Sequence, residues 1–157
     1  MKLLRLFVIA LATVIAVPAF AQDKPANNME ILRQKIKADK KLVVAANMEL
    51  TEGEAKGFWP VYDAYQADLG QLNERLAKMV LRYADLYKNN TLTDAEAKSL
   101  LDEALAIEQA EVAMKQGYVP KLSAVLPATK VARYLQIENK IRAVIKYELA
   151  DGIPLVK

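Results

Sequence analysis

Residues 58–86, FWPVYDAYQADLGQLNERLAKMVLRYADL, place an apolar side chain at every third or fourth position. The positions that share this rhythm are Phe58, Tyr62, Tyr65, Leu69, Leu72, Leu76, Met79, Tyr83 and Leu86. Such a 4-3-4-3 spacing, kept for about four heptads, predicts a long helix with one apolar face. We expect the helix to run from about Glu52 to Lys88, roughly 55 Å, and to need partner helices of similar length to bury that face.

The first 21 residues have the pattern of a secretory signal peptide. Lys2 and Arg5 give a positive start, residues 6–17 form an apolar run, and Ala19-Phe20-Ala21 is a small-x-small cleavage signature. The run of about 12 residues is shorter than the roughly 20 that span a bilayer, so cleavage after Ala21 is expected, with an uncleaved anchor as the alternative. The sequence thus predicts export to the periplasm.

Residues 22–157 are expected to form a single helical domain, with a flexible lead-in at 22–27 and a C-terminal tail at 151–157. The chain contains no cysteine, so we expect neither a lipid-modified cysteine nor a disulfide. Stability must then come from helix packing.

Three further helices are predicted around the long one. The first begins with Asn28 as its N-cap, the third begins at Thr93, and the fourth begins near Pro127 and ends at Gly152. Their predicted apolar faces are Met29, Leu32, Ile36, Val43 and Asn47 in the first, Leu100, Ala104, Ile107, Met114, Tyr118, Leu122 and Val125 in the third, and Val131, Tyr134, Leu135, Ile141, Val144, Ile145 and Leu149 in the fourth. The short turn at 88–91 implies an antiparallel hairpin. The predicted fold is all-α: a long, bent, four-helix antiparallel arrangement in which a helical hairpin is flanked by two further helices.

A helix-capping motif occurs twice. Thr51 can accept a hydrogen bond from the Glu54 amide while the Glu54 side chain reaches back to the Thr51 amide, with Leu50 at the preceding position. The same pattern returns at Leu92, Thr93 and Glu96. We interpret both motifs as helix starts.

An aromatic cluster surrounds Pro60, which should kink the long helix near Gly57. The cluster consists of Phe58, Trp59, Tyr62 and Tyr65. It is interpreted either as core packing or as an apolar surface for a partner. Candidate basic contacts for such a partner are Arg33, Lys37 and Lys40 on the first helix and Arg133 on the last. The alternative for these charges is a solvated helix face.

Charge is unevenly divided between the last two helices. Residues 91–125 contain three basic and six acidic side chains, whereas residues 126–157 contain six basic and three acidic ones. Opposite charges of this kind can set the pairing of helices, within one chain or between two chains. Two solvated faces are the alternative.

The composition removes several classes of function. With no histidine, the commonest general base and transition-metal ligand are missing, so Glu108 and Glu111 cannot complete a di-iron site and are interpreted as surface charge. Ser99 and Ser123 have no base beside them in the helical pattern, and no glycine-rich phosphate loop occurs. The 22 basic residues against 19 acidic ones do not indicate a nucleic-acid partner. We therefore predict no catalytic, cofactor-binding or metal-binding residues, and no enzyme.

With Leu50-Thr51-x-x-Glu54 opening its long helix, this cysteine-free chain resembles the Spy/CpxP family of periplasmic helical proteins, known for LTXXQ motifs. Glu54 stands where the family has glutamine, and Leu126-Pro127-Ala128-Thr129-Lys130 resembles a degenerate second copy. The resemblance implies a curved homodimer that contacts its clients on an apolar and basic concave face. It also implies an ATP-independent chaperone for exposed apolar segments of envelope proteins. The alternative is a regulatory module that docks on a membrane sensor in envelope-stress signalling.

Overall fold

The computed structural model describes residues 40–156, and within that range all regular structure is helical. A helical segment at 40–48 precedes α2 (Glu52–Lys88), α3 (Asp94–Ser123) and α4 (Ala128–Gly152). The all-α, four-helix prediction is confirmed, and α2 has the predicted bounds. The predicted signal peptide, lead-in and residues 28–39 of the first helix lie outside the described residues.

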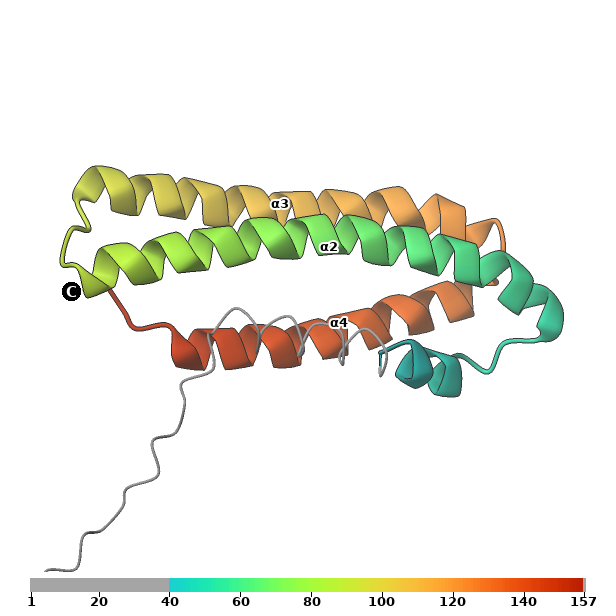
Figure 1. Cartoon of the computed structure of the whole chain (residues 1–157). Helices are drawn as coiled ribbons and strands as arrows, with labels where there is room; N and C mark the ends of the chain where they lie inside the picture. Colours follow the sequence, from blue (N-terminus) through green and yellow to red (C-terminus); the bar gives the residue numbers. More distant parts are fainter. Residues whose placement is uncertain (1–39, 157) are drawn as a thin grey trace, which may run out of the picture. The chain divides into compact units, whose positions relative to one another are not determined.

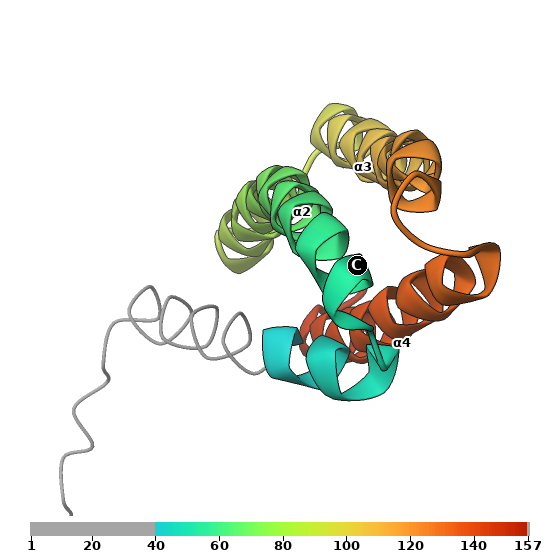
Figure 2. The same ribbon diagram turned by 90° about the vertical axis from the view of Figure 1, so that its right-hand side faces the viewer.

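The helices α2 and α3 form the antiparallel hairpin that the short turn predicted, and they lie side by side in both views (Figures 1 and 2). The helix α4 packs less closely. Its Cα atoms come within 8 Å of α3 but not of α2. Large side chains must therefore fill the space between α4 and α2.

One aromatic cluster fills much of that space. Tyr134 of α4 is fully buried, and the centroid of its ring lies 5.1 Å from that of Phe58 and 5.6 Å from that of Tyr65. Tyr65 in turn meets Tyr118 of α3, with ring centroids 5.1 Å apart. Residues of α2, α3 and α4 thus share a single core at this end of the hairpin.

The apolar face of α2 is buried along only half of its length. Its first five predicted positions are buried: Phe58, Tyr62, Tyr65, Leu69 and Leu72. The remaining four, Leu76, Met79, Tyr83 and Leu86, are half-buried. The helix passes through Pro60 without a break, and its ribbon curves near that end (Figure 1).

The predicted faces of the first and last helices need correction. Val43 and Asn47 are exposed, and Val44 and Met48, one position further along, are fully buried. Successive residues of a helix are about 100° apart, so a shift of one position places the buried side chains on a different side of the segment. That side also carries Lys40, which donates to Glu138. In α4, Val144 is 59% exposed, whereas Glu138 and Arg142 are buried.

The C-terminal tail is only partly covered. The Tyr83 hydroxyl donates to the Pro154 carbonyl oxygen over 2.8 Å, which holds the tail beside α2. Leu155 and Val156 beyond it are exposed. Among the described residues, none of the helices combines the length and hydropathy that crossing a membrane needs.

Candidate functional site

The capping motif at the start of α2 forms as predicted and has an additional partner. The Glu54 amide donates to Thr51 Oγ1 over 3.3 Å, and the Thr51 amide donates to Glu54 Oε2 over 2.7 Å. Lys130 of α4 then donates to the same Glu54 oxygen over 2.6 Å and to the Glu49 carbonyl oxygen over 2.9 Å. The bond from Lys130 and the bond from the Thr51 amide hold the pKa of Glu54 below its ordinary value. The motif thus joins α2 to α4, which the pattern of the motif alone did not predict.

The second capping motif forms one of its two expected hydrogen bonds. The Glu96 amide donates to Thr93 Oγ1 over 3.2 Å, but the Glu96 carboxylate pairs with Arg82 of α2. Leu50 and Leu92, the residues before the two caps, are both half-buried. Both motifs therefore start helices, as predicted, and the second also links the two helices of the hairpin.

Three of the four aromatic candidates for partner binding are core residues. Phe58, Tyr62 and Tyr65 are 0%, 3% and 1% exposed, so no partner can reach them in this fold. The core-packing interpretation holds for these three, and the partner-surface interpretation is wrong. Trp59 is half-buried, with Lys41 Nζ 5.1 Å from its ring centroid.

Two of the four basic candidates form ion pairs, and the other two lie outside the described residues. Lys40 donates to Glu138 over 2.7 Å and to Gln66 over 2.9 Å. Arg133 is half-exposed and lies 3.5 Å from a carboxylate oxygen of Glu49. Arg33 and Lys37 lie outside the described residues.

A buried polar layer lies between α4 and the other helices, and the sequence reasoning missed it. Glu138 accepts from Lys40 of the 40–48 segment and from Gln66 of α2, the latter over 2.8 Å. Gln66 also donates to the Tyr134 hydroxyl over 3.2 Å. Burial, with the negative charge of Glu138 nearby, raises the pKa of Tyr134.

A second buried cluster centres on Glu111, which was predicted to be surface charge. That prediction is wrong, because Glu111 is only 4% exposed. Its Oε2 accepts from Arg142 Nη2 over 2.9 Å, and its Oε1 accepts from Lys115 over 2.8 Å. Burial would raise the pKa of Glu111, but the hydrogen bond from Lys115 and the charge of Arg142 outweigh it and lower the pKa to about 2. Glu108, by contrast, is exposed as expected.

The polar layer is internally satisfied. Arg142 also donates to Asn73 of α2, and no buried side-chain nitrogen or oxygen among the described residues lacks a hydrogen-bond partner. A buried carboxylate that is fully paired positions helices and does not present itself to a substrate. The sequence signal that could have found the layer is the spacing of Glu138 and Arg142, which falls on the apolar face of α4.

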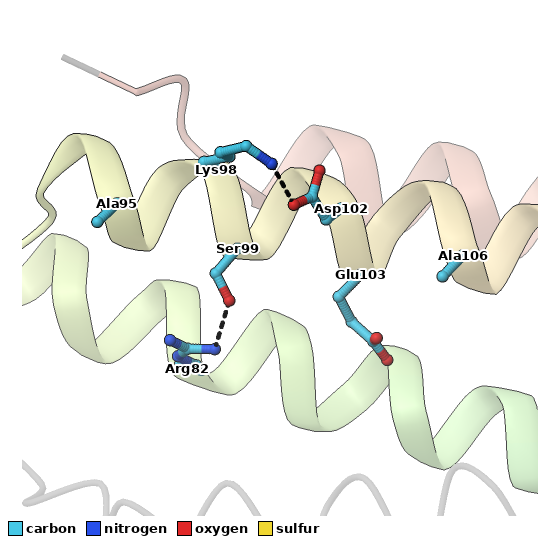
Figure 3. A pocket seen from close by; sticks show the side chains of 7 residues that line it. All are labelled: Arg82, Ala95, Lys98, Ser99, Asp102, Glu103 and Ala106. Atoms are coloured by element: carbon cyan, nitrogen blue, oxygen red, sulfur yellow. Dashed lines mark hydrogen bonds and ion pairs between the residues drawn. The ribbon is translucent and has the colours of Figure 1, made fainter.

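A shallow groove runs along the exposed side of the α2–α3 hairpin (Figure 3). It is lined by Arg82, Ala95, Lys98, Ser99, Asp102, Glu103 and Ala106. Arg82 donates to Ser99 Oγ over 3.3 Å, and Lys98 pairs with Asp102 over 2.6 Å. An arginine stays protonated and cannot take a proton from a serine, so this contact does not activate Ser99 as a nucleophile. Among residues 40–156, no group of three or more acidic side chains could hold a metal ion.

The most distinctive exposed feature is a row of aliphatic side chains on α3, which we call the α3 stripe. It consists of Leu101, Leu105, Val112 and Val119, which are 58%, 49%, 55% and 41% exposed. At about 100° per residue these four positions fall within about 40° of one line along the helix, over roughly 27 Å. They lie on a different side of α3 from its buried face, which comprises Leu100, Ile107, Glu111, Tyr118 and Leu122.

Comparison with protein-family models, with curated proteins and with solved structures finds no match for this chain.

Proposed function

We propose that the chain is a binding protein that shields exposed apolar segments of other proteins without nucleotide, acting in the periplasm to which its N-terminal pattern would direct it. The observation that carries this proposal is the α3 stripe, because a row of half-exposed branched aliphatics on a well-packed helix has no role in the core of the chain. Aligned aliphatic positions at helical spacing suit contact with an apolar segment of a client.

The chemistry of the described residues supports binding over catalysis. The buried charges are paired with one another, and the serine in the hairpin groove faces an arginine. The exposed side chains that core packing does not explain include the aliphatic residues of the α3 stripe. A protein that offers apolar surface on a stable scaffold can bind a client by removing that surface from water, and the entropy lost on association offsets part of the gain.

The test is the aggregation of two unrelated denatured proteins in the presence of the purified chain, without ATP. We expect near-stoichiometric suppression for both. The Leu105→Glu/Val112→Glu variant should lose suppression, because each glutamate places a charge where a client would bury apolar surface. Leu81→Glu is the matched control, since Leu81 is 68% exposed but lies on α2 outside the stripe.

The same assay separates the main alternative. If the natural chain is folded by circular dichroism and suppresses the aggregation of neither client, the general chaperone proposal fails. A regulatory module with one dedicated membrane partner would then be the better account, and crosslinking in the periplasm would be used to identify that partner.

A further inference from the structure

Two kinds of contact hold the helix α4 along its length. In its first half, Val131 and Tyr134 are buried in the apolar core, and among the described residues that core takes in α4 only as far as Ile137. Beyond Ile137, the two buried side chains of α4 are both charged, Glu138 and Arg142. The first half of α4 is thus held by apolar packing and the second half by buried charges.

Charged and polar contacts join this second half to α3 and α2. One carboxylate, that of Glu111 on α3, faces three cations. They are Lys115 of its own helix and Arg142 and Lys146 of α4, at 2.8, 2.9 and 3.5 Å. Arg142 also donates to Asn73 of α2. The apolar positions of α4 beside these contacts are only half-buried: Ile141, Ile145 and Leu149.

The two kinds of contact respond differently when helices separate. Apolar side chains that leave a core are transferred into water without compensation, whereas charges that leave a buried ion pair regain their hydration. The ion pair therefore adds little net free energy to the closed arrangement, although removing one partner alone leaves a buried charge unpaired. Opening the second half of α4 should cost less free energy than opening the first half.

We propose that residues 139–152, here called the α4 strap, open from the hairpin as one unit while residues 128–137 stay packed in the core. The strap and the tail that follows it lie beside the second half of α2. Arg142 contacts Asn73 there, and the Tyr83 hydroxyl donates to the Pro154 carbonyl oxygen. The strap thus closes over the hairpin at two points of α2 that are ten residues apart.

Opening of the strap would uncover apolar surface on α2. Leu76 and Met79 lie between Asn73 and Tyr83 on the apolar face of this helix, and both are half-buried. The use of this surface for a client rests on the proposed function, whereas the opening itself does not. The strap would then let the chain vary how much apolar surface it exposes.

Hydrogen exchange of single backbone amides, measured by NMR at low urea concentrations, tests the strap. The amides of residues 139–152 should share one free energy of opening, lower than that of the hairpin amides. It should change little with urea, because the strap exposes less surface than complete unfolding does. Simple fraying would give protection that falls steadily toward Gly152, and that result would overturn the proposal. Equal protection in 128–137 and 139–152 would also overturn it.

Two variants test whether the charges around Glu111 hold the strap closed. Glu111→Gln should speed exchange in 139–152 by on the order of 100-fold, because it leaves Arg142 buried without its carboxylate. Glu111→Leu/Arg142→Met should exchange more slowly than Glu111→Gln, because the unpaired arginine is removed as well. Glu108→Gln is the matched control and should change nothing, since Glu108 is exposed on the same helix. An effect of Glu111→Gln no larger than that of Glu108→Gln would contradict the proposal.

A substitution in the core shows whether the core stays packed while the strap opens. Phe58 is fully buried, with its ring centroid 5.1 Å from that of Tyr134. Phe58→Leu should reduce the protection of the hairpin amides, which exchange through complete unfolding, and leave exchange in 139–152 unchanged. An equal change in both would show that the strap opens only when the whole fold does. No client is present in these measurements, so their failure is distinguishable from failure of the aggregation assay.

Discussion

Gly57 lies where α2 passes the end of α3. A methyl group on Gly57 would lie 2.8 Å from Cγ1 and 2.9 Å from Cβ of Val125, closer than side-chain carbons pack. At Gly70, in the same helix, no such neighbour lies within 4 Å. The two glycines therefore do different things: Gly57 allows close packing, and Gly70 only adds flexibility to the unfolded chain.

Alanine at these two positions should have opposite effects. Gly70→Ala should raise the free energy of unfolding by about 0.5–1 kcal/mol, because alanine has less backbone freedom to lose in a helix. Gly57→Ala should lower it, since the Val125 side chain is branched and its Cβ cannot move without shifting the backbone. Urea unfolding of both variants measures the difference. An equal gain in both would show that α2 and Val125 do not approach this closely.

The cap at Thr51 is a second feature that acts through single residues. Thr51→Ala should lower the free energy of unfolding by about 1 kcal/mol, because it leaves a helix amide without its acceptor. Thr93→Ala removes the same single bond at the start of α3 and is the matched comparison. Thermal unfolding of the two variants measures both caps. If Thr51→Ala left folding unchanged but abolished client protection, the motif would be a binding element.

At the scale of one element, α2 is a helix whose burial changes along its length. Leu72 is 9% exposed, Leu76 is half-buried and Leu81 is 68% exposed. Leu72→Ala should lower the free energy of unfolding by about 2–5 kcal/mol, with a smaller loss for Leu76→Ala. Leu81→Ala should change it by less than about 0.5 kcal/mol. Chemical denaturation checks this ranking, and a loss below about 1 kcal/mol for Leu72→Ala would show that the face of α2 is not buried there.

We expect the stability of the contact between α3 and α4 to depend on pH through Glu111. Its pKa falls from 4.5 to about 2 in the folded state, and the cations that face it are Lys115, Arg142 and Lys146. A carboxyl group with a lowered folded pKa stabilises the fold above its unfolded pKa and loses that contribution as pH falls through the folded value. The stability supplied by Glu111 should therefore be complete above pH 4.5 and decline toward pH 2, by on the order of 3 kcal/mol.

Urea unfolding between pH 6 and pH 2.5 measures this decline. Glu111→Gln should be less stable than the natural chain at pH 6 and should lose this part of the pH dependence. Glu108→Gln is the control, since Glu108 is exposed on the same helix. If Glu111→Gln retained the full decline between pH 4.5 and pH 2.5, the buried pair with Arg142 would not form in solution.

At the scale of residues 40–156, the fold combines two kinds of interface. The helices α2 and α3 approach each other with Cα atoms within 8 Å, whereas α4 joins α2 through tyrosines and buried polar side chains. Removing one partner of such a polar contact leaves the other charge buried and unpaired, so these contacts fix the position of α4. The helices α2 and α3 thus lie close together, and side-chain contacts fix the position of α4 beside them.

Much of this arrangement could be predicted from the chain alone. The spacing of apolar residues in 58–86 predicts the length of α2, and the threonine caps predict where α2 and α3 begin, because helix starts depend on residues within one turn. The shortness of the turn after Lys88 predicts the antiparallel hairpin. These features depend on residues that are close in the sequence, so the sequence alone is enough to predict them.

Other features depend on residues far apart in the chain. Lys40 meets Glu138 at a separation of 98 positions, and Glu111 meets Arg142 at a separation of 31. A periodic pattern shows which side of a helix is apolar, but it cannot show that a charge on that side will find a counter-charge on another helix. Likewise, the sequence does not show that Val112 and Val119 stay exposed, because no other helix of the described chain covers them. The sequence by itself determined α2, α3 and α4 and where each of them begins. The tertiary structure decided which charges are buried and which aliphatic side chains stay exposed, because burial depends on the neighbours that packing supplies.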